Sequence, residues 1–188
     1  MTKLAGVLSL ALLAACGGPK IDATQLTNAI QQNLGTTKEF DLSNSGLDGL
    51  EIAVMVPDTL HSKLKASKSD YTGTIDIVAG AAFKMMLTSN AVFEDDTMEV
   101  SLKTAMGTVK HNIDETTCKF IVNEPNAVIW EYKNDAGQVA YHVFAVFPDG
   151  TKKSTYYSIS DNDASPCSES AAKCMLEMGK TIKPKPSA

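Results

Sequence analysis

The segment from Gln138 to Pro148 limits the fold more than any other part of the chain, because an extended strand there is apolar on both faces. Successive side chains of a strand point to opposite faces of the sheet. One face would carry Val139, Tyr141, Val143, Ala145 and Phe147, and the other Ala140, His142, Phe144 and Val146. A strand of this kind is buried from both sides. The segment therefore predicts a central strand with a packed layer above and below it.

Strand signals surround this segment and continue through the second half of the chain. The predicted strands are Lys119 to Asn123, Asn126 to Lys133, Gln138 to Pro148 and Thr151 to Ser160. Asn134 to Gly137 and Asp149-Gly150 have the composition of hairpin turns, and Asp-Gly is among the strongest such signals. These four strands predict an antiparallel meander.

The first half of the mature chain carries weaker strand patterns. Strands are predicted over Leu50 to Val56, Tyr71 to Val78 and Ala82 to Leu87, and a helix is an alternative for the last of these. Residues 58–69 have the composition of a loop or a frayed turn. Helices are predicted over Asp22 to Gly35, over Phe93 to Met106 with Gly107 as the stop, and over Ser165 to Lys180. We expect one α+β domain over residues 22–180, an antiparallel sheet flanked by helices, with residues 181–188 as a disordered tail.

The first sixteen residues have the layout of an export signal. Lys3 precedes an uncharged run from Leu4 to Ala15. As a helix this run would rise roughly 18 Å, which is too short for a hydrocarbon core of about 30 Å. A charged start, a short apolar centre and small residues at the end are typical of a secretory signal peptide.

The end of that run, Leu13-Ala14-Ala15-Cys16, resembles the lipobox of bacterial lipoproteins. The resemblance implies cleavage of residues 1–15, attachment of diacylglycerol to Cys16, and a tether over residues 16–21. Two or three acyl chains anchor a protein far more firmly than one. Gly17 stands where an aspartate would favour the inner membrane, so the resemblance implies the outer membrane, facing the periplasm. The alternative is an ordinary cleaved signal followed by a chance cysteine.

Charge and cysteine content narrow the function classes. The chain has a formal net charge of −5, and all 17 basic residues are lysines. Arginine is the side chain that binds phosphates and guanine edges through paired hydrogen bonds. Because the chain has no arginine and is mildly acidic, we expect no nucleic-acid partner. Export would permit a disulfide. We expect a disulfide between Cys167 and Cys174. Cys118 is expected to be buried on a strand. These three cysteines are too few for a zinc site.

Few residues point to chemistry. The three histidines lie far apart, and the chain has none of the usual nucleophile, phosphate-binding or zinc-protease motifs. We expect no cofactor, no metal and no catalytic residue, although Cys118 with His142 is a pair to examine for a dispersed hydrolase site. His142 itself is expected to be packed or hydrogen-bonded in the sheet. Trp130 and Tyr132 share one strand face with Val128, where they either pack in the core or form a ligand or partner surface.

The order of elements over residues 36–180 resembles the Mog1/PsbP-like α/β/α sandwich, some bacterial members of which are lipoproteins. The resemblance implies a protein that binds or organises other proteins. The first functional hypothesis is therefore a non-enzymatic, membrane-anchored envelope lipoprotein that binds a protein partner or helps to assemble a complex. The alternative is a carrier of a small apolar ligand, with a cavity lined by the methionines Met85, Met86, Met98 and Met175.

Overall fold

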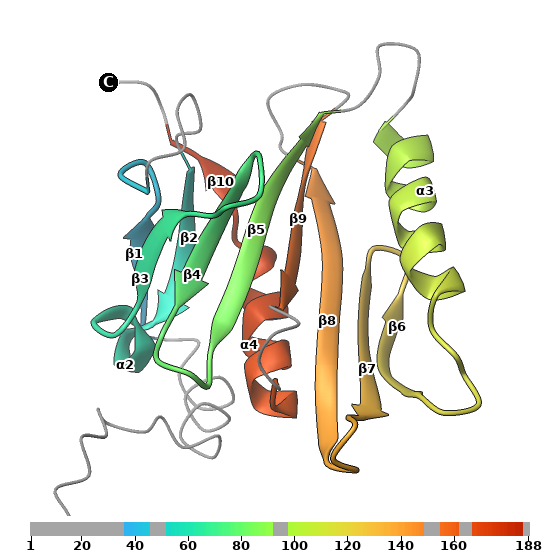
Figure 1. Cartoon of the computed structure of the whole chain (residues 1–188). Coiled ribbons are helices and arrows are strands. Elements are labelled where there is room, and N and C mark those ends of the chain that lie inside the picture. The colour runs from blue at the N-terminus through green and yellow to red at the C-terminus, as the bar shows by residue number, and fades with distance from the viewer. Residues whose placement is uncertain (1–35, 46–51, 92–97, 149–154, 162–166, 186–188) are drawn as a thin grey trace, which may run out of the picture.

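The computed structural model describes residues 36–45, 52–91, 98–148, 155–161 and 167–185. The strands are β1 (Thr37–Asp41), β2 (Ile52–Pro57), β3 (Lys65–Lys68), β4 (Thr74–Val78), β5 (Lys84–Ala91), β6 (Lys119–Glu124), β7 (Ala127–Lys133), β8 (Val139–Pro148), β9 (Thr155–Asp161) and β10 (Lys183–Pro184). The helices are α2 (Asp58–His61), α3 (Met98–His111) and α4 (Glu169–Gly179), as Figure 1 shows.

The strands form two antiparallel sheets. The large sheet has the order β3-β4-β5-β9-β8-β7-β6, and the small sheet has the order β1-β2-β10. In the large sheet, β9 lies between β5 and β8 and is hydrogen-bonded to both. It joins the meander β3-β4-β5 from the first half of the chain to the meander β6-β7-β8 from the second.

Each face of the large sheet is covered by a different layer. On one face, α4 and the small sheet enclose the main core, in which Val54, Leu87 and Met175 are fully or almost fully buried. On the other face, α3 packs on β8 and β9 through a smaller cluster around Met106, Val128 and Val146. Figure 1 shows α3 and α4 on opposite sides of the sheet. The α+β class with an antiparallel sheet flanked by helices is thereby confirmed.

The prediction of a doubly covered central strand is confirmed in β8. Val143 and Ala145 belong to the main core under α4, whereas Phe144 and Val146 pack in the cluster under α3. The turn at Asn134 is also confirmed. The Asn134 side-chain oxygen accepts hydrogen bonds from the backbone N–H groups of Ala136 and Gln138, and Gly137 has the positive φ of 73° that the turn requires.

Two predictions of secondary structure need correction. Residues 58–69, expected to be a loop or a frayed turn, contain the short helix α2 and the strand β3. The backbone of β3 pairs with β4 although its side chains are mostly exposed. Helix α3 continues through Gly107 to His111, because its last turns are held on the sheet by Val109. A glycine ends a helix through a left-handed backbone, and Gly107 does not adopt one.

The prediction of a disordered tail over residues 181–188 is wrong as far as residue 185. Lys183 and Pro184 pair with Ala53 and Ile52 of β2. Lys183 lies 2.8 Å from a Glu39 carboxylate oxygen, and Lys185 donates a hydrogen bond to Asp41. The Lys185 ammonium, with the hydroxyl and amide of Ser43, lowers the pKa of Asp41 to about 2. Side-chain ion pairs to β1 and backbone pairing to β2 therefore hold the C-terminal segment.

The three cysteines of the domain are free, so the expected Cys167–Cys174 disulfide is not formed in this structure. The backbone of Cys167 is fixed by a bridge to Tyr141, and its thiol donates to the Ser168 carbonyl at 3.4 Å. Burial raises the pKa of each of these two thiols to about 12. Cys118 was expected to be buried on a strand, but it is half-exposed and precedes β6.

Three predictions fall outside the described residues. They are the signal and lipobox up to Cys16, the helix from Asp22 to Gly35, and the turn at Asp149-Gly150. Within the described ranges, no helix combines the length and the apolar character needed to cross a membrane.

Candidate functional site

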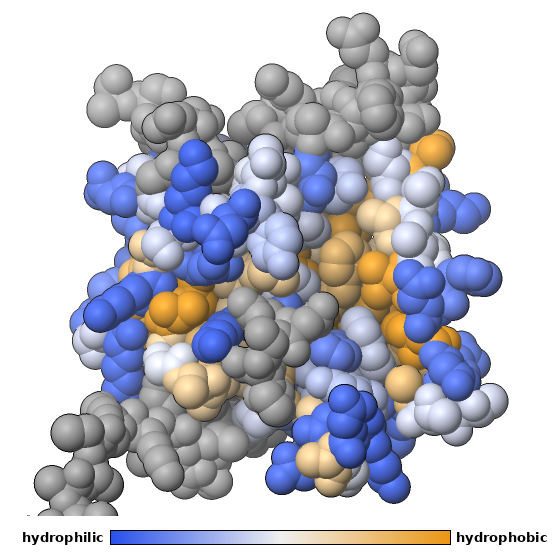
Figure 2. Space-filling view, viewed as in Figure 1, coloured by the Kyte–Doolittle hydropathy of each residue, from blue (hydrophilic) through white to orange (hydrophobic). Residues whose placement is uncertain are grey.

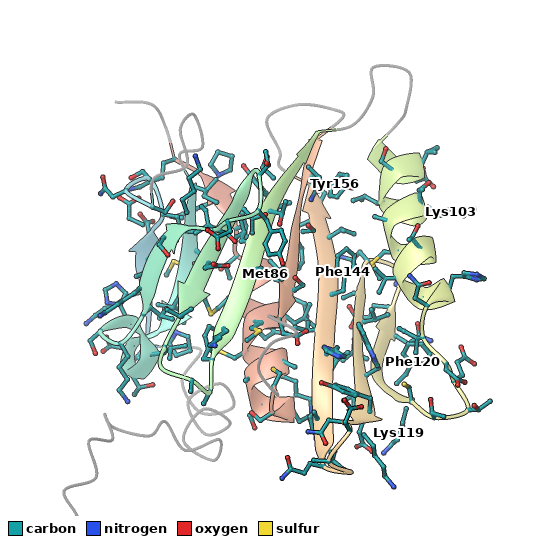
Figure 3. All side chains as sticks on the ribbon, viewed as in Figure 1. Met86, Lys103, Lys119, Phe120, Phe144 and Tyr156 are labelled. Atoms are coloured by element: carbon teal, nitrogen blue, oxygen red, sulfur yellow. The ribbon has the colours of Figure 1, made fainter. Side chains whose placement is uncertain are left out.

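A pocket of about 390 Å³ opens on the large sheet beside the last turns of α3. Its described lining residues come from β5, β7, β8, β9 and α3, and they are Met86, Val109, Trp130, Tyr132, His142, Phe144, Ser160 and Asp161. Figure 2 shows apolar side chains gathered between the middle of the sheet and α3, and Figure 3 labels Met86 and Phe144, which belong to this wall. The pocket is thus a mostly aromatic and apolar hollow on a sheet face.

Strand register brings most of these side chains to one face. Trp130 on β7 lies opposite His142 on β8. Ser160 on β9 lies between Phe144 on β8 and Met86 on β5, because it is the register partner of both. Residues two apart on a strand share a face, so Tyr132 joins Trp130 and Phe144 joins His142.

The pocket exists because α3 covers only part of this face. Leu102, Ala105, Met106 and Val109 of the helix pack against the cluster that contains Val128 and Val146. Trp130 and His142 are register partners on β7 and β8, and Val109 is the described α3 residue that lines the pocket with them. Among the residues that the structure describes, the sheet face beyond Val109 therefore keeps an aromatic floor without a helix above it.

A buried carboxylate fixes the histidine of the pocket. His142 Nδ1 lies 2.9 Å from Asp161 Oδ2, and the Val143 backbone N–H donates to Asp161 Oδ1 at 2.8 Å. The residue Asp161 is only 3% exposed. Both carboxylate oxygens therefore accept a hydrogen bond from adjacent residues of β8. The carboxylate, as an acceptor, places a proton on His142 Nδ1.

Two aromatic rings of β7 contact the imidazole. Tyr132 stacks on His142 with centroids 4.2 Å apart and an angle of 5° between the ring planes. Trp130 lies with its centroid 5.1 Å from the imidazole, tilted by 43°. With Asp161 at its edge, His142 is positioned by three side chains. The pocket wall is therefore a set of oriented rings.

The structure brings some of the predicted site residues into the pocket and places others away from it. Trp130 and Tyr132 lie together in the wall of the pocket, and their role in binding stays a prediction. Cys118 is not beside His142, because Cys118 precedes β6 and the strand β7 separates β6 from β8. Of the methionines expected around a cavity, Met86 lines the pocket, whereas Met85 and Met175 are buried in the main core on the opposite face. The side chain of Met98 lies outside the described residues.

The sequence pattern does not indicate Asp161 or Ser160 as site residues. Both belong to the end of a strand that was expected to stop at Ser160. Among the residues that the structure describes, no cluster of three or more histidine, cysteine or acidic side chains is arranged to hold a metal ion.

Comparisons with known proteins give little beyond this geometry. No protein-family model matches the chain, and no curated protein matches it. A solved crystal structure from Bacteroides thetaiotaomicron VPI-5482 is similar over 80% of this chain and 49% of its own length, with 9% sequence identity and a TM-score of 0.43. This chain thus spans about half the length of that protein. The Mog1/PsbP-like resemblance stays a prediction.

Proposed function

We propose that this protein is a non-enzymatic, lipid-anchored protein of the bacterial envelope that binds a small ligand with an apolar body in the pocket beside α3. The anchor rests on the resemblance of residues 13–16 to a lipobox, and Gly17 after the cysteine favours the outer membrane, on its periplasmic side, over the inner membrane. The ligand-binding role rests on the pocket, because its rings are already oriented. This proposal favours the carrier over the hypothesis of a protein partner.

The observation that carries the proposal is the volume and lining of the pocket. Its roughly 390 Å³ lies at the small end of the range of about 300–1,000 Å³ that ligand pockets occupy. A pocket for a small molecule is usually apolar and aromatic with a few placed polar groups. Here, Trp130 and Phe144 supply the apolar wall, and His142 and Ser160 supply the polar groups.

A protein partner is the second candidate function. The aromatic side chains of the pocket are partly exposed on a sheet face, so a side chain of a partner would reach the same residues. Pull-down of the lipidated protein from envelope extract, with native mass spectrometry of the captured protein, separates the two functions. A bound small molecule without a stoichiometric protein supports the carrier, and a stoichiometric protein without a small molecule supports the partner.

The pocket offers a direct binding assay, because Trp130 is the single tryptophan of the chain. We expect 2-phenylethanol to change the Trp130 emission of the processed full-length protein with a Kd on the order of millimolar, as befits a ligand of nine heavy atoms. Phe144→Ala removes one wall and is expected to weaken binding roughly threefold to tenfold.

Val100→Ala is the matched control for this assay, because Val100 is exposed on α3, away from the lining residues. It is expected to leave the Kd unchanged. An equal effect of the Phe144 and Val100 substitutions, or an unchanged emission in the wild type, contradicts the ligand pocket.

The anchor is tested by Cys16→Ser. The thiolate of cysteine is the nucleophile that accepts the lipid, and serine does not replace it. We expect the variant to lose metabolic labelling with palmitate and to accumulate with its signal peptide uncleaved. Cys118→Ser is the control, which should keep both labelling and processing. Labelling that persists in Cys16→Ser refutes the lipobox interpretation.

A further inference from the structure

We propose that the ligand of this pocket is an organic cation with an apolar body, such as a quaternary ammonium compound. The inference rests on the proposed ligand-binding function and names its ligand class. It comes from two properties of the described lining: its charge, which does not become positive, and its three π-rich rings.

The charge of the lining has two states. Asp161 is the one carboxylate among the described lining residues, and His142 is the one histidine; no lysine is among them. With His142 neutral the lining carries one negative charge, and with His142 protonated it carries none. An anion therefore meets a negatively charged wall when His142 is neutral and an uncharged wall when His142 is protonated. A cation meets the buried Asp161 charge in one of the two states, where the low local dielectric strengthens the attraction.

The aromatic residues favour the same class of ligand. The faces of Trp130, Tyr132 and Phe144 carry negative quadrupole charge, which attracts a cation within about 6 Å of a ring centroid. One face of Tyr132 is occupied by the stacked imidazole. Quaternary ammonium groups suit such rings because they are weakly hydrated and make no hydrogen bonds that the apolar wall would have to replace.

Described charged groups beyond the lining do not reverse this balance, because one carboxylate and one lysine lie along the same face. Asp76 on β4 is the register partner of Met86, and its Oδ1 is buried without a hydrogen-bond partner among the described residues. The nearest cation along β5 is Lys84, two residues before Met86. On α3, Lys110 follows Val109, but its ammonium donates to the Glu124 carbonyl at 3.0 Å. The neighbouring His111 is exposed.

A pH dependence follows from the contact between His142 and Asp161. Protonation of His142 cancels the carboxylate charge, and the described groups that contact the imidazole from neighbouring strands include Asp161 on β9 and Trp130 and Tyr132 on β7. Cation affinity should therefore fall as the pH is lowered from about 8 to about 5, the interval in which histidines gain a proton. The affinity of a neutral ligand of the same shape should change much less.

The test uses three probes of nearly equal shape and different charge: choline, neutral 3,3-dimethylbutan-1-ol and anionic 3,3-dimethylbutanoate. Each is titrated into the processed full-length protein in a non-ionic detergent, with Trp130 emission as the readout. At pH 8 we expect choline to bind roughly twofold to thirtyfold more tightly than the alcohol, which is the range of a cation–π contribution. The anion should bind more weakly than the alcohol.

Three variants identify the groups responsible. His142→Gln keeps a hydrogen-bond donor for Asp161 but does not titrate, so the preference for choline should persist and its pH dependence should vanish. Asp161→Asn removes the charge and should bring choline and the alcohol to similar affinities. Tyr132→Leu removes a ring without changing charge, and it should reduce the affinity for choline more than that for the alcohol. Val100→Ala should change none of these values.

The outcomes separate the two proposals. If the alcohol binds the wild type as tightly as choline at pH 8, the cation inference is overturned and the ligand pocket stands. If Tyr132→Leu and Asp161→Asn both leave the ratio of the two affinities unchanged, the inference is overturned as well. If neither these probes nor 2-phenylethanol changes the Trp130 emission, both proposals are refuted.

Discussion

Replacing Asp161 by alanine is expected to lower the free energy of unfolding by about 2–4 kcal/mol. The carboxylate accepts hydrogen bonds from the Val143 backbone N–H and from His142, and its removal leaves a buried donor in β8 without a partner. An unsatisfied buried group costs about 1–3 kcal/mol, and the lost contact to His142 adds to this. Urea unfolding followed by circular dichroism measures the difference.

Two further variants, one at the same position and one at the preceding residue, serve as comparisons for Asp161→Ala. Asp161→Asn keeps an acceptor for the Val143 N–H, so it should lose roughly half as much stability. Ser160→Ala removes a pocket hydroxyl and leaves the hydrogen bonds of Asp161 in place, so its effect should lie within about 0.5 kcal/mol. A loss for Asp161→Ala no larger than that for Ser160→Ala would show that Asp161 does not stabilise the strand end.

The second large effect is expected for Gly179→Ala at the end of α4. A Cβ built on Gly179 would lie 2.5 Å from Phe147 Cε2 and 3.3 Å from Ile159 Cγ1. Phe147 is 9% exposed and part of the main core, so the ring has little room to move. Overpacking of this kind costs about 1–3 kcal/mol. The melting temperature should fall by roughly 2–12 °C.

Gly107 supplies the opposite case in the same chain. It lies within α3, and a Cβ there would meet nothing within 4 Å. Gly107→Ala should therefore stabilise the protein by about 0.5–1 kcal/mol through helix propensity. Phe147→Leu should recover part of the loss when it is combined with Gly179→Ala. Equal melting temperatures for the two single glycine variants would contradict the packing argument.

The parts of the fold that the sequence predicts are those in which the side-chain pattern and burial agree. β8 is predicted because both of its faces are apolar, and α4 because an apolar face recurs at helical spacing. β1 and β3 leave no such pattern, since most of their side chains are exposed. Backbone hydrogen bonds to neighbouring strands hold them in place, and side-chain alternation does not report such bonds. β10 is similar, because two residues are too short a run for a pattern.

The candidate site, like the fold, can be predicted from the sequence only in part. Trp130 and Tyr132 are on one face because residues two apart on a strand are always so, and the sequence predicts this. The contact of His142 with Asp161 depends on β9 pairing with β8, and the pocket depends also on β5 pairing with β9. Pairing partners and register follow from packing across the whole domain. Local patterns in a single sequence therefore do not bring Met86, His142 and Ser160 together.

The order of strands in the large sheet also sets when this domain becomes a single cooperative unit during its synthesis. A nascent chain that ends before Thr155 contains the strands of both three-stranded meanders, but it lacks β9, to which each of them is hydrogen-bonded. α4 and β10, which close the main core and the small sheet, come later still. The last fifth of the chain thus has to emerge before the rest can fold as one body, and a truncation there leaves two meanders without a common sheet.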